Sequence, residues 1–157
     1  QSDSLNMIAY CLVHMHKLTT AAHYLIDHSI PQHLISYSNT ALMYGYMQRY
    51  DIEMTIYMEI YKHLQAKAGA SDLSSTEVLY RLARAAKNNE KYLFAQEAYS
   101  NLLDNLSTEG GINYRIDTPQ LYLDYAFVLL ETHKLKDTLQ VCNCALSCIS
   151  ETSVVCT

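Results

Sequence analysis

The stretch that decides the fold runs from residue 79 to residue 102 and reads LYRLARAAKNNEKYLFAQEAYSNL. It holds two small residues, Ala83 and Ala95, twelve positions apart on either side of a polar segment. Apolar residues recur three and four positions apart before and after that segment, which is the period of an amphipathic helix. The stretch therefore predicts two helices joined by a short turn, with a small side chain on each where their backbones approach closely.

The same arrangement occurs twice more in the chain. Ala9 and Ala21 stand twelve apart, as do Ala126 and Thr138, each pair in a similar apolar frame. Repetition of one helix pair predicts a stack of antiparallel hairpins, an all-α solenoid. We expect helices at 4–16, 19–29, 32–48, 51–67, 74–88, 91–106, 118–132 and 135–149. They form hairpins at 4–30, 32–67, 74–106 and 118–149, in one helical-repeat array over 1–157 that is a segment of a longer protein.

Local signals place two helix starts and one irregular hairpin. Ser74 followed by Glu77 is a capping-box pattern, and Thr118 followed by Pro119 is a cap-then-proline pattern. In hairpin 32–67 the small residue of the first helix is Ala41, but Glu53 stands twelve positions on, where a small residue is expected. We therefore expect that hairpin to pack in a shifted or looser way.

The repeated frame resembles the tetratricopeptide repeat (TPR) in a degenerate form. In the central copy Leu82 and Ala83 match the family's leucine–small pair, and Tyr92, Ala95 and Tyr99 match its second-helix positions. The matching residues are Leu5, Ile8, Ala9, Leu18, Ala21 and Leu25 in the first copy, and Tyr122, Ala126, Leu135, Cys142 and Ala145 in the last. The chain has no tryptophan, and its repeat spacing is irregular. The resemblance implies hairpins stacked as a TPR-like right-handed superhelix that binds other proteins.

Composition excludes several classes of function. The net charge is −5 and the basic residues are scattered, which argues against a nucleic-acid partner. No apolar run approaches the roughly 18 residues that span a bilayer, and the first residues do not read as a signal peptide. The five cysteines are odd in number and three lie in one predicted helix, which is not a disulfide framework. We expect an intracellular protein, of the cytoplasm, the nucleus or a cytoskeletal assembly.

Motifs for chemistry are absent from the sequence. It has no phosphate-binding loop, dinucleotide turn, nucleophile elbow or zinc-protease motif, so we expect no enzyme activity and no cofactor. Two groups contain residue types that can bind a metal: Cys11 with nearby histidines, and Cys142, Cys144 and Cys148. Neither group has the spacing of a zinc site, and packed or surface side chains are the preferred interpretation.

The resemblance places the functional surface on the exposed face of each first helix, which lines a concave groove. That face comprises Asn6, Tyr10, Val13, His14, Leu42, Tyr46, Tyr80, Arg84, Lys87, Asn88, Leu123, Phe127, Leu130 and Glu131. We expect protein contacts from Tyr10, Tyr46, Tyr80, Arg84, Lys87 and Phe127. The few cations among them disfavour a carboxylate clamp, and the groove fits an apolar helix or extended segment better. A second interpretation has this face covered by another stretch of the same protein.

The predicted function is a non-enzymatic scaffold within a large intracellular multi-subunit assembly, whose partners are other protein subunits. Three alternatives stay open at this point. The chain could be an adaptor that binds peptide tails reversibly, a regulatory helical domain attached to an enzyme, or a small enzyme or metal protein itself.

Overall fold

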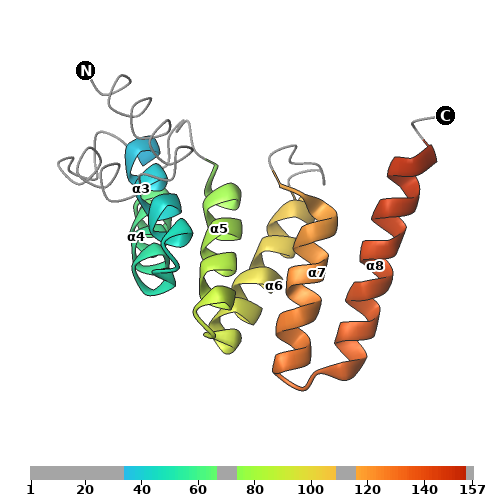
Figure 1. Ribbon diagram of the computed structural model, residues 1–157. Coiled ribbons are helices and arrows are strands. Elements are labelled where there is room, and N and C mark those ends of the chain that lie inside the picture. Colours follow the sequence, from blue (N-terminus) through green and yellow to red (C-terminus); the bar gives the residue numbers. More distant parts are fainter. Residues whose placement is uncertain (1–33, 67–73, 109–115, 155–157) are drawn as a thin grey trace. The chain divides into compact units, whose positions relative to one another are not determined.

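The computed structural model describes residues 34–66, 74–108 and 116–154, which form six α-helices and no strand (Figure 1). The helices are α3 (Leu34–Tyr46), α4 (Tyr50–Ala66), α5 (Ser75–Asn88), α6 (Tyr92–Thr108), α7 (Thr118–Glu131) and α8 (Leu135–Val154). The helices predicted at 4–16 and 19–29 lie outside the described residues. Within the described ranges every predicted helix is present.

The predicted and the observed C-terminal ends differ most for helix α8. It continues to Val154, whereas the prediction ended at residue 149. The sequence after Ala145 contains neither glycine nor proline, so no residue there breaks the helix.

The chain divides into two compact units, residues 1–78 and residues 79–157. In the first unit α3 packs against α4. Met43 and Tyr57 are fully buried between them, and the Tyr57 hydroxyl donates to the Ser38 carbonyl at 3.4 Å. At the edge of the pair, the Tyr37 hydroxyl donates to Glu59 Oε2 at 2.8 Å. The prediction of one continuous array over 1–157 stays a prediction.

Glycine on α3 makes room for the glutamate that breaks the small-residue pattern. Glu53 is only 9% exposed, although glutamate is rarely buried. Its Oε1 lies 2.6 Å from the position that a Cβ on Gly45 would take. Because Gly45 has no side chain, the Glu53 carboxylate fits against α3. In the repeat pattern a small residue at position 53 would have provided this space instead. The hairpin keeps its antiparallel pairing by moving the small residue to the facing helix.

The three joints between paired helices share one backbone geometry. Gln48, Glu90 and His133 each adopt a left-handed conformation, with φ of 59°, 57° and 62°. Their N–H groups donate to the carbonyls of Gly45, Lys87 and Leu130, at 2.9, 3.1 and 3.0 Å. The next N–H in each joint donates to the carbonyls of Tyr44, Ala86 and Leu129, at 2.9, 2.9 and 2.8 Å. This pair of bonds is the Schellman motif, which ends a helix and reverses the chain. The sequence repeat is therefore a structural repeat.

The second unit contains α5 from Leu79 onward, together with α6, α7 and α8. Helix α7 packs against α6 on one side and against α8 on the other. Ala83 and Ala95 are fully buried, as the twelve-residue pairing predicted. Ala126 and Ala145 are also buried, and the rings of Tyr99 and Tyr125 lie 5.7 Å apart between α6 and α7. Small residues and aromatic rings together set how closely these helices approach.

Capping side chains fix the starts of two helices. The Ser74 hydroxyl accepts from the Thr76 N–H at 3.2 Å, which confirms the predicted cap of α5. At α7 the prediction was one residue late, because Asp117 is the N-cap and Thr118 already lies in the helix. The Asp117 carboxylate accepts from the Gln120 N–H at 3.2 Å, and Pro119 lies in the first turn. A carboxylate at this position also interacts favourably with the helix dipole.

Candidate functional site

An open groove of about 450 Å³ lies within the second unit. It is bounded by the end of α5, the turn into α6 and one face of α7. The residues that line it are Lys87, Asn88, Glu90, Tyr92, Gln120, Leu123, Asp124 and Phe127. It has an apolar side and a charged side.

Two side chains of α7 form the apolar side. Leu123 and Phe127 are one helical turn apart, and they remain 48% and 45% exposed. The Phe127 ring meets the edge of Tyr92 from α6, with ring centroids 6.1 Å apart and planes at 68°. This edge-to-face contact is a preferred arrangement of aromatic rings and holds Phe127 in place. The groove therefore presents a fixed apolar surface that a partner side chain could cover.

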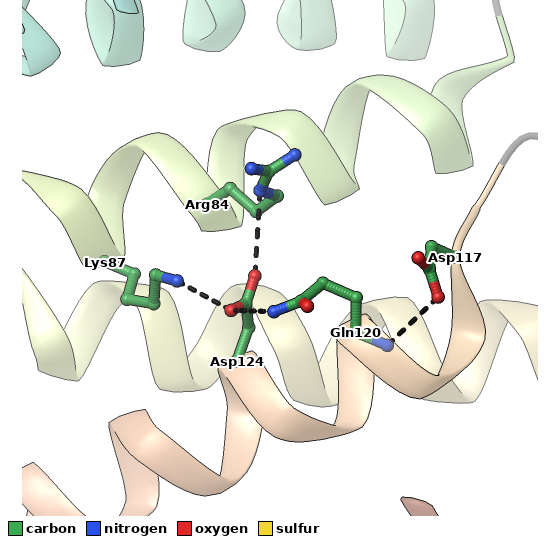
Figure 2. A network of polar contacts seen from close by, with 5 residues as sticks. All are labelled: Arg84, Lys87, Asp117, Gln120 and Asp124. Carbon is green, nitrogen blue, oxygen red and sulfur yellow. Dashed lines mark hydrogen bonds and ion pairs between the residues drawn. The ribbon is translucent and has the colours of Figure 1, made fainter. Parts of the chain in front are cut away.

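The charged side is organised around Asp124 (Figure 2). Lys87 Nζ donates to Asp124 Oδ1 at 2.7 Å, and Gln120 Nε2 donates to the same oxygen at 2.9 Å. Arg84 Nε lies 3.6 Å from the other oxygen, Oδ2. Figure 2 shows these side chains converging on the carboxylate from α5 and from the first turns of α7. Lys87 on α5 and Asp124 on α7 are 37 residues apart in sequence, so this ion pair joins two helices that are distant along the chain.

The members of this network differ in their access to solvent. The Asp124 side chain is 6% exposed and Lys87 is 19% exposed, whereas Arg84 is 51% exposed. Asp124 therefore holds Lys87 within the protein, and Arg84 is the cation of this network with the most surface left for a ligand. The Arg84 guanidinium also lies 5.7 Å from the ring centre of Tyr80, a cation–π contact that steadies it.

Tyr99 connects the network to the core. Its side chain is fully buried on α6. Burial raises the pKa of the Tyr99 hydroxyl, and the nearby Asp124 charge raises that pKa further. Both effects disfavour a second negative charge beside the carboxylate, so Tyr99 stays protonated. Asp124 is thus enclosed by the core on one side and by the groove on the other.

The structure brings together some of the predicted contact residues. Lys87 and Phe127 line the groove, and Arg84 reaches its charged side through Asp124. Tyr80 is only 6% exposed, so its ring contacts Arg84 but has little surface left for a partner protein. Tyr46 is 59% exposed on α3 of the first unit. Tyr10 lies outside the described residues. Protein binding by these side chains stays a prediction.

The sequence analysis missed Gln120 and Asp124. They lie four residues apart, so they share the helix face that carries Leu123 and Phe127. That spacing was a usable signal. It does not by itself predict a buried carboxylate, because an aspartate on an amphipathic helix is more often exposed to solvent than buried and the cationic partners of Asp124 come from another helix.

No metal site is found among the described residues, since no group of three or more histidine, cysteine or acidic side chains there could hold an ion. Cys142, Cys144 and Cys148 lie on α8, and none of the three forms a disulfide. The other group of possible metal ligands, Cys11 with nearby histidines, lies outside the described residues. None of the helices in the described ranges is long and apolar enough to cross a membrane.

Comparison with known proteins yields matches to solved structures. No family model matches the chain, and no curated protein matches its sequence. Fourteen solved chains match its fold. MamA (MSR-1, C2) aligns with a TM-score of 0.72 at 14% identity, over 97% of this chain and 79% of MamA. A protein described as a kinesin light chain of Podosopora anserina, with nearly identical TPR-like repeats, aligns with a TM-score of 0.74 at 14% identity, over 97% of this chain and 76% of its own.

These matches establish the fold. At 14% identity the structural similarity shows a shared helical-hairpin architecture and nothing beyond the fold. The all-α, TPR-like solenoid class predicted from the sequence is confirmed.

Proposed function

We propose that this TPR-like chain is a non-enzymatic protein-interaction scaffold, and that its groove between α5 and α7 binds an apolar segment of a partner protein. One observation carries the proposal. The groove sets two exposed apolar side chains, Leu123 and Phe127, beside a charged network that is already paired within the protein.

The pairing of that network favours binding over catalysis. Lys87 and Gln120 both donate to one oxygen of Asp124, so these polar groups are engaged with one another inside the protein. The same hydrogen bonds hold α5 and α7 in fixed relation before any ligand arrives. A groove prepared in this way loses less conformational entropy on binding.

The ligand that fits this groove is an apolar segment with a polar edge. Leu123 and Phe127 bury partner side chains, which supplies most of the binding energy. Asn88, Glu90 and the open side of Arg84 supply hydrogen bonds at the rim. We extend the proposal to a chain that holds protein subunits within a larger intracellular assembly, because an apolar groove rimmed by polar groups suits stable association.

A peptide-display selection tests the proposal directly. Random peptides would be selected on the purified chain, and their affinities measured against Leu123→Ala combined with Phe127→Ala. We expect binding to weaken at least tenfold in this variant. The matched control is Leu93→Ala, because Leu93 is 78% exposed on α6 and lies outside the groove. Selected peptides that bind the double variant as tightly as the original chain would refute the proposal.

The reversible adaptor is a second candidate, favoured by the exposure of Arg84. A guanidinium that is half open to solvent can form a two-point hydrogen bond with a ligand carboxylate. If the chain is such an adaptor, selected peptides will carry an acidic residue next to their apolar anchor, and Arg84→Gln will weaken them. A scaffold that holds apolar segments alone predicts no acidic preference.

A further inference from the structure

Helix α8 carries an apolar stripe that the groove does not use. Leu135, Leu139 and Leu146 are 62%, 69% and 64% exposed, and the half-buried Cys142 lies between them. The four residues are separated by four, three and four positions, the spacing of a coiled-coil seam. The adjacent face of α8 carries the buried Ala145 and packs on α7. The stripe is therefore a separate surface.

The internal repeat shows what this surface is shaped to receive. The residues 43 positions earlier on α6 are Tyr92, Gln96, Tyr99 and Leu103. Three of them hold α7. The Tyr92 ring contacts Phe127, Gln96 Oε1 accepts from the Thr132 hydroxyl at 3.1 Å, and the Tyr99 ring lies 5.7 Å from Tyr125. The equivalent face of α8 has the geometry to receive an antiparallel helix.

The chemistry of the two faces differs in a way that points to the partner. Where α6 has an aromatic ring at Tyr92 and an amide at Gln96, α8 has Leu135 and Leu139. A ring and an amide suit the ring and hydroxyl that α7 offers, whereas leucines suit another leucine-bearing helix. A second α8 is such a helix, and its seam has the same spacing.

We propose that the α8 stripe pairs with the α8 stripe of a second copy of this chain, in an antiparallel two-fold contact. In this pairing Leu135 of one copy lies against Leu146 of the other, and Leu139 lies against Cys142. Each contact occurs twice by symmetry, as an isologous interface requires.

Charge and size are compatible with this pairing. Lys136 and Asp137 are the only charged residues between positions 135 and 148, and the antiparallel arrangement places Lys136 near Asn143 to Ala145 of the other copy. No like charges meet. A stripe of about three helical turns is roughly 17 Å long, and two of them make an interface at the small end of the range, below about 1,200 Å² in total. We therefore expect a dimer that dissociates on dilution.

Sedimentation velocity on the whole chain tests the pairing. The weight-average mass of the original chain is expected to rise toward twice the monomer mass over a concentration range of about a hundredfold. Leu139→Glu and, independently, Leu146→Glu should each keep the chain monomeric over the whole range. Both residues are mostly exposed, so these variants are expected to fold, and circular dichroism checks that they do. Leu93→Glu, which places the same charge on an exposed leucine of α6, should dimerise like the original chain.

Three outcomes overturn the proposal. The original chain could remain monomeric at every concentration, which would leave the stripe to a helix of another protein. The dimer could persist in Leu139→Glu and Leu146→Glu, which would place the contact elsewhere. It could also be lost equally in Leu93→Glu, which would make the effect one of charge alone.

Discussion

Replacing Lys87 with methionine tests whether the charged network stabilises the second unit. The substitution keeps an unbranched apolar stem and removes the ammonium group 2.7 Å from Asp124 Oδ1. Breaking a fully buried ion pair costs about 3–5 kcal/mol. Lys87 is 19% exposed, and Gln120 and Arg84 still face the carboxylate, so we expect a smaller loss of about 2 kcal/mol.

The reciprocal substitution should cost less. Asp124→Leu leaves a lysine whose flexible stem can carry its ammonium group into water, so we expect a loss of about 1 kcal/mol. With both changes no buried charge is left alone, and the double variant should also lose only about 1 kcal/mol. The two substitutions are therefore expected to be non-additive by about 2 kcal/mol.

Urea unfolding followed by circular dichroism measures all four proteins of this cycle. Lys91→Met is the matched control, because Lys91 is exposed in the turn before α6, and it should change the free energy of unfolding by less than about 0.5 kcal/mol. The account of the network is wrong if the losses of the two single variants add to that of the double variant. It is also wrong if Lys87→Met costs no more than Lys91→Met.

Three further substitutions test other parts of the structure. Ala83→Leu should overpack the joint of α5 and α6 and cost about 1–3 kcal/mol, and an unchanged melting temperature would undo the helix register. Gly45→Ala should lower the free energy of unfolding, because the new Cβ would meet the Glu53 carboxylate. In a Glu53→Ala background the same substitution should raise the free energy of unfolding by up to about 1 kcal/mol through helix propensity. A change of the same sign in both backgrounds would contradict the packing of Glu53 against Gly45. Burial, then the hydrogen bond and charge of Glu59, raises the pKa of Tyr37 to about 12. An unfolded tyrosine ionises near 10, so the unfolded state loses its proton first and the free energy of unfolding should fall from about pH 10 to about pH 12. Tyr37→Phe should remove this part of the loss, and an equal loss in both proteins would show that Tyr37 is not its source.

The helices and their joints could be predicted because their signals are local. Apolar residues three and four apart define α5 and α6, and the pairing of Ala83 with Ala95 marks where the two helices touch. Both alanines are fully buried in the structure. Periodicity over a dozen residues is sufficient for this step, because each hairpin forms from residues close in sequence.

Contacts between distant residues could not be predicted in the same way. The carboxylate of Asp124 is buried because Lys87 and Arg84 approach it from another helix, and no local pattern gives that approach. Tyr80 was expected to face a partner, but a helix face alone does not say how much of a long side chain a neighbour covers.

The way in which the structure accommodates Glu53 could not be predicted from the sequence either. In the sequence, Glu53 predicts only that this hairpin departs from the small-residue pattern. The compensating residue, Gly45, could be identified only when α3 and α4 were seen together. Compensation across two helices is a property of their packing and leaves no fixed spacing in the sequence.

Nuclear magnetic resonance mapping of a selected peptide on the isotope-labelled chain tests the central claim most directly, because it locates the bound segment without any substitution. The account predicts that the largest changes in amide chemical shift fall in residues 87–92 and 120–127, on both sides of the groove. Changes confined to residues 135–146 of α8, or to α3 and α4, with the groove signals unmoved, would contradict it.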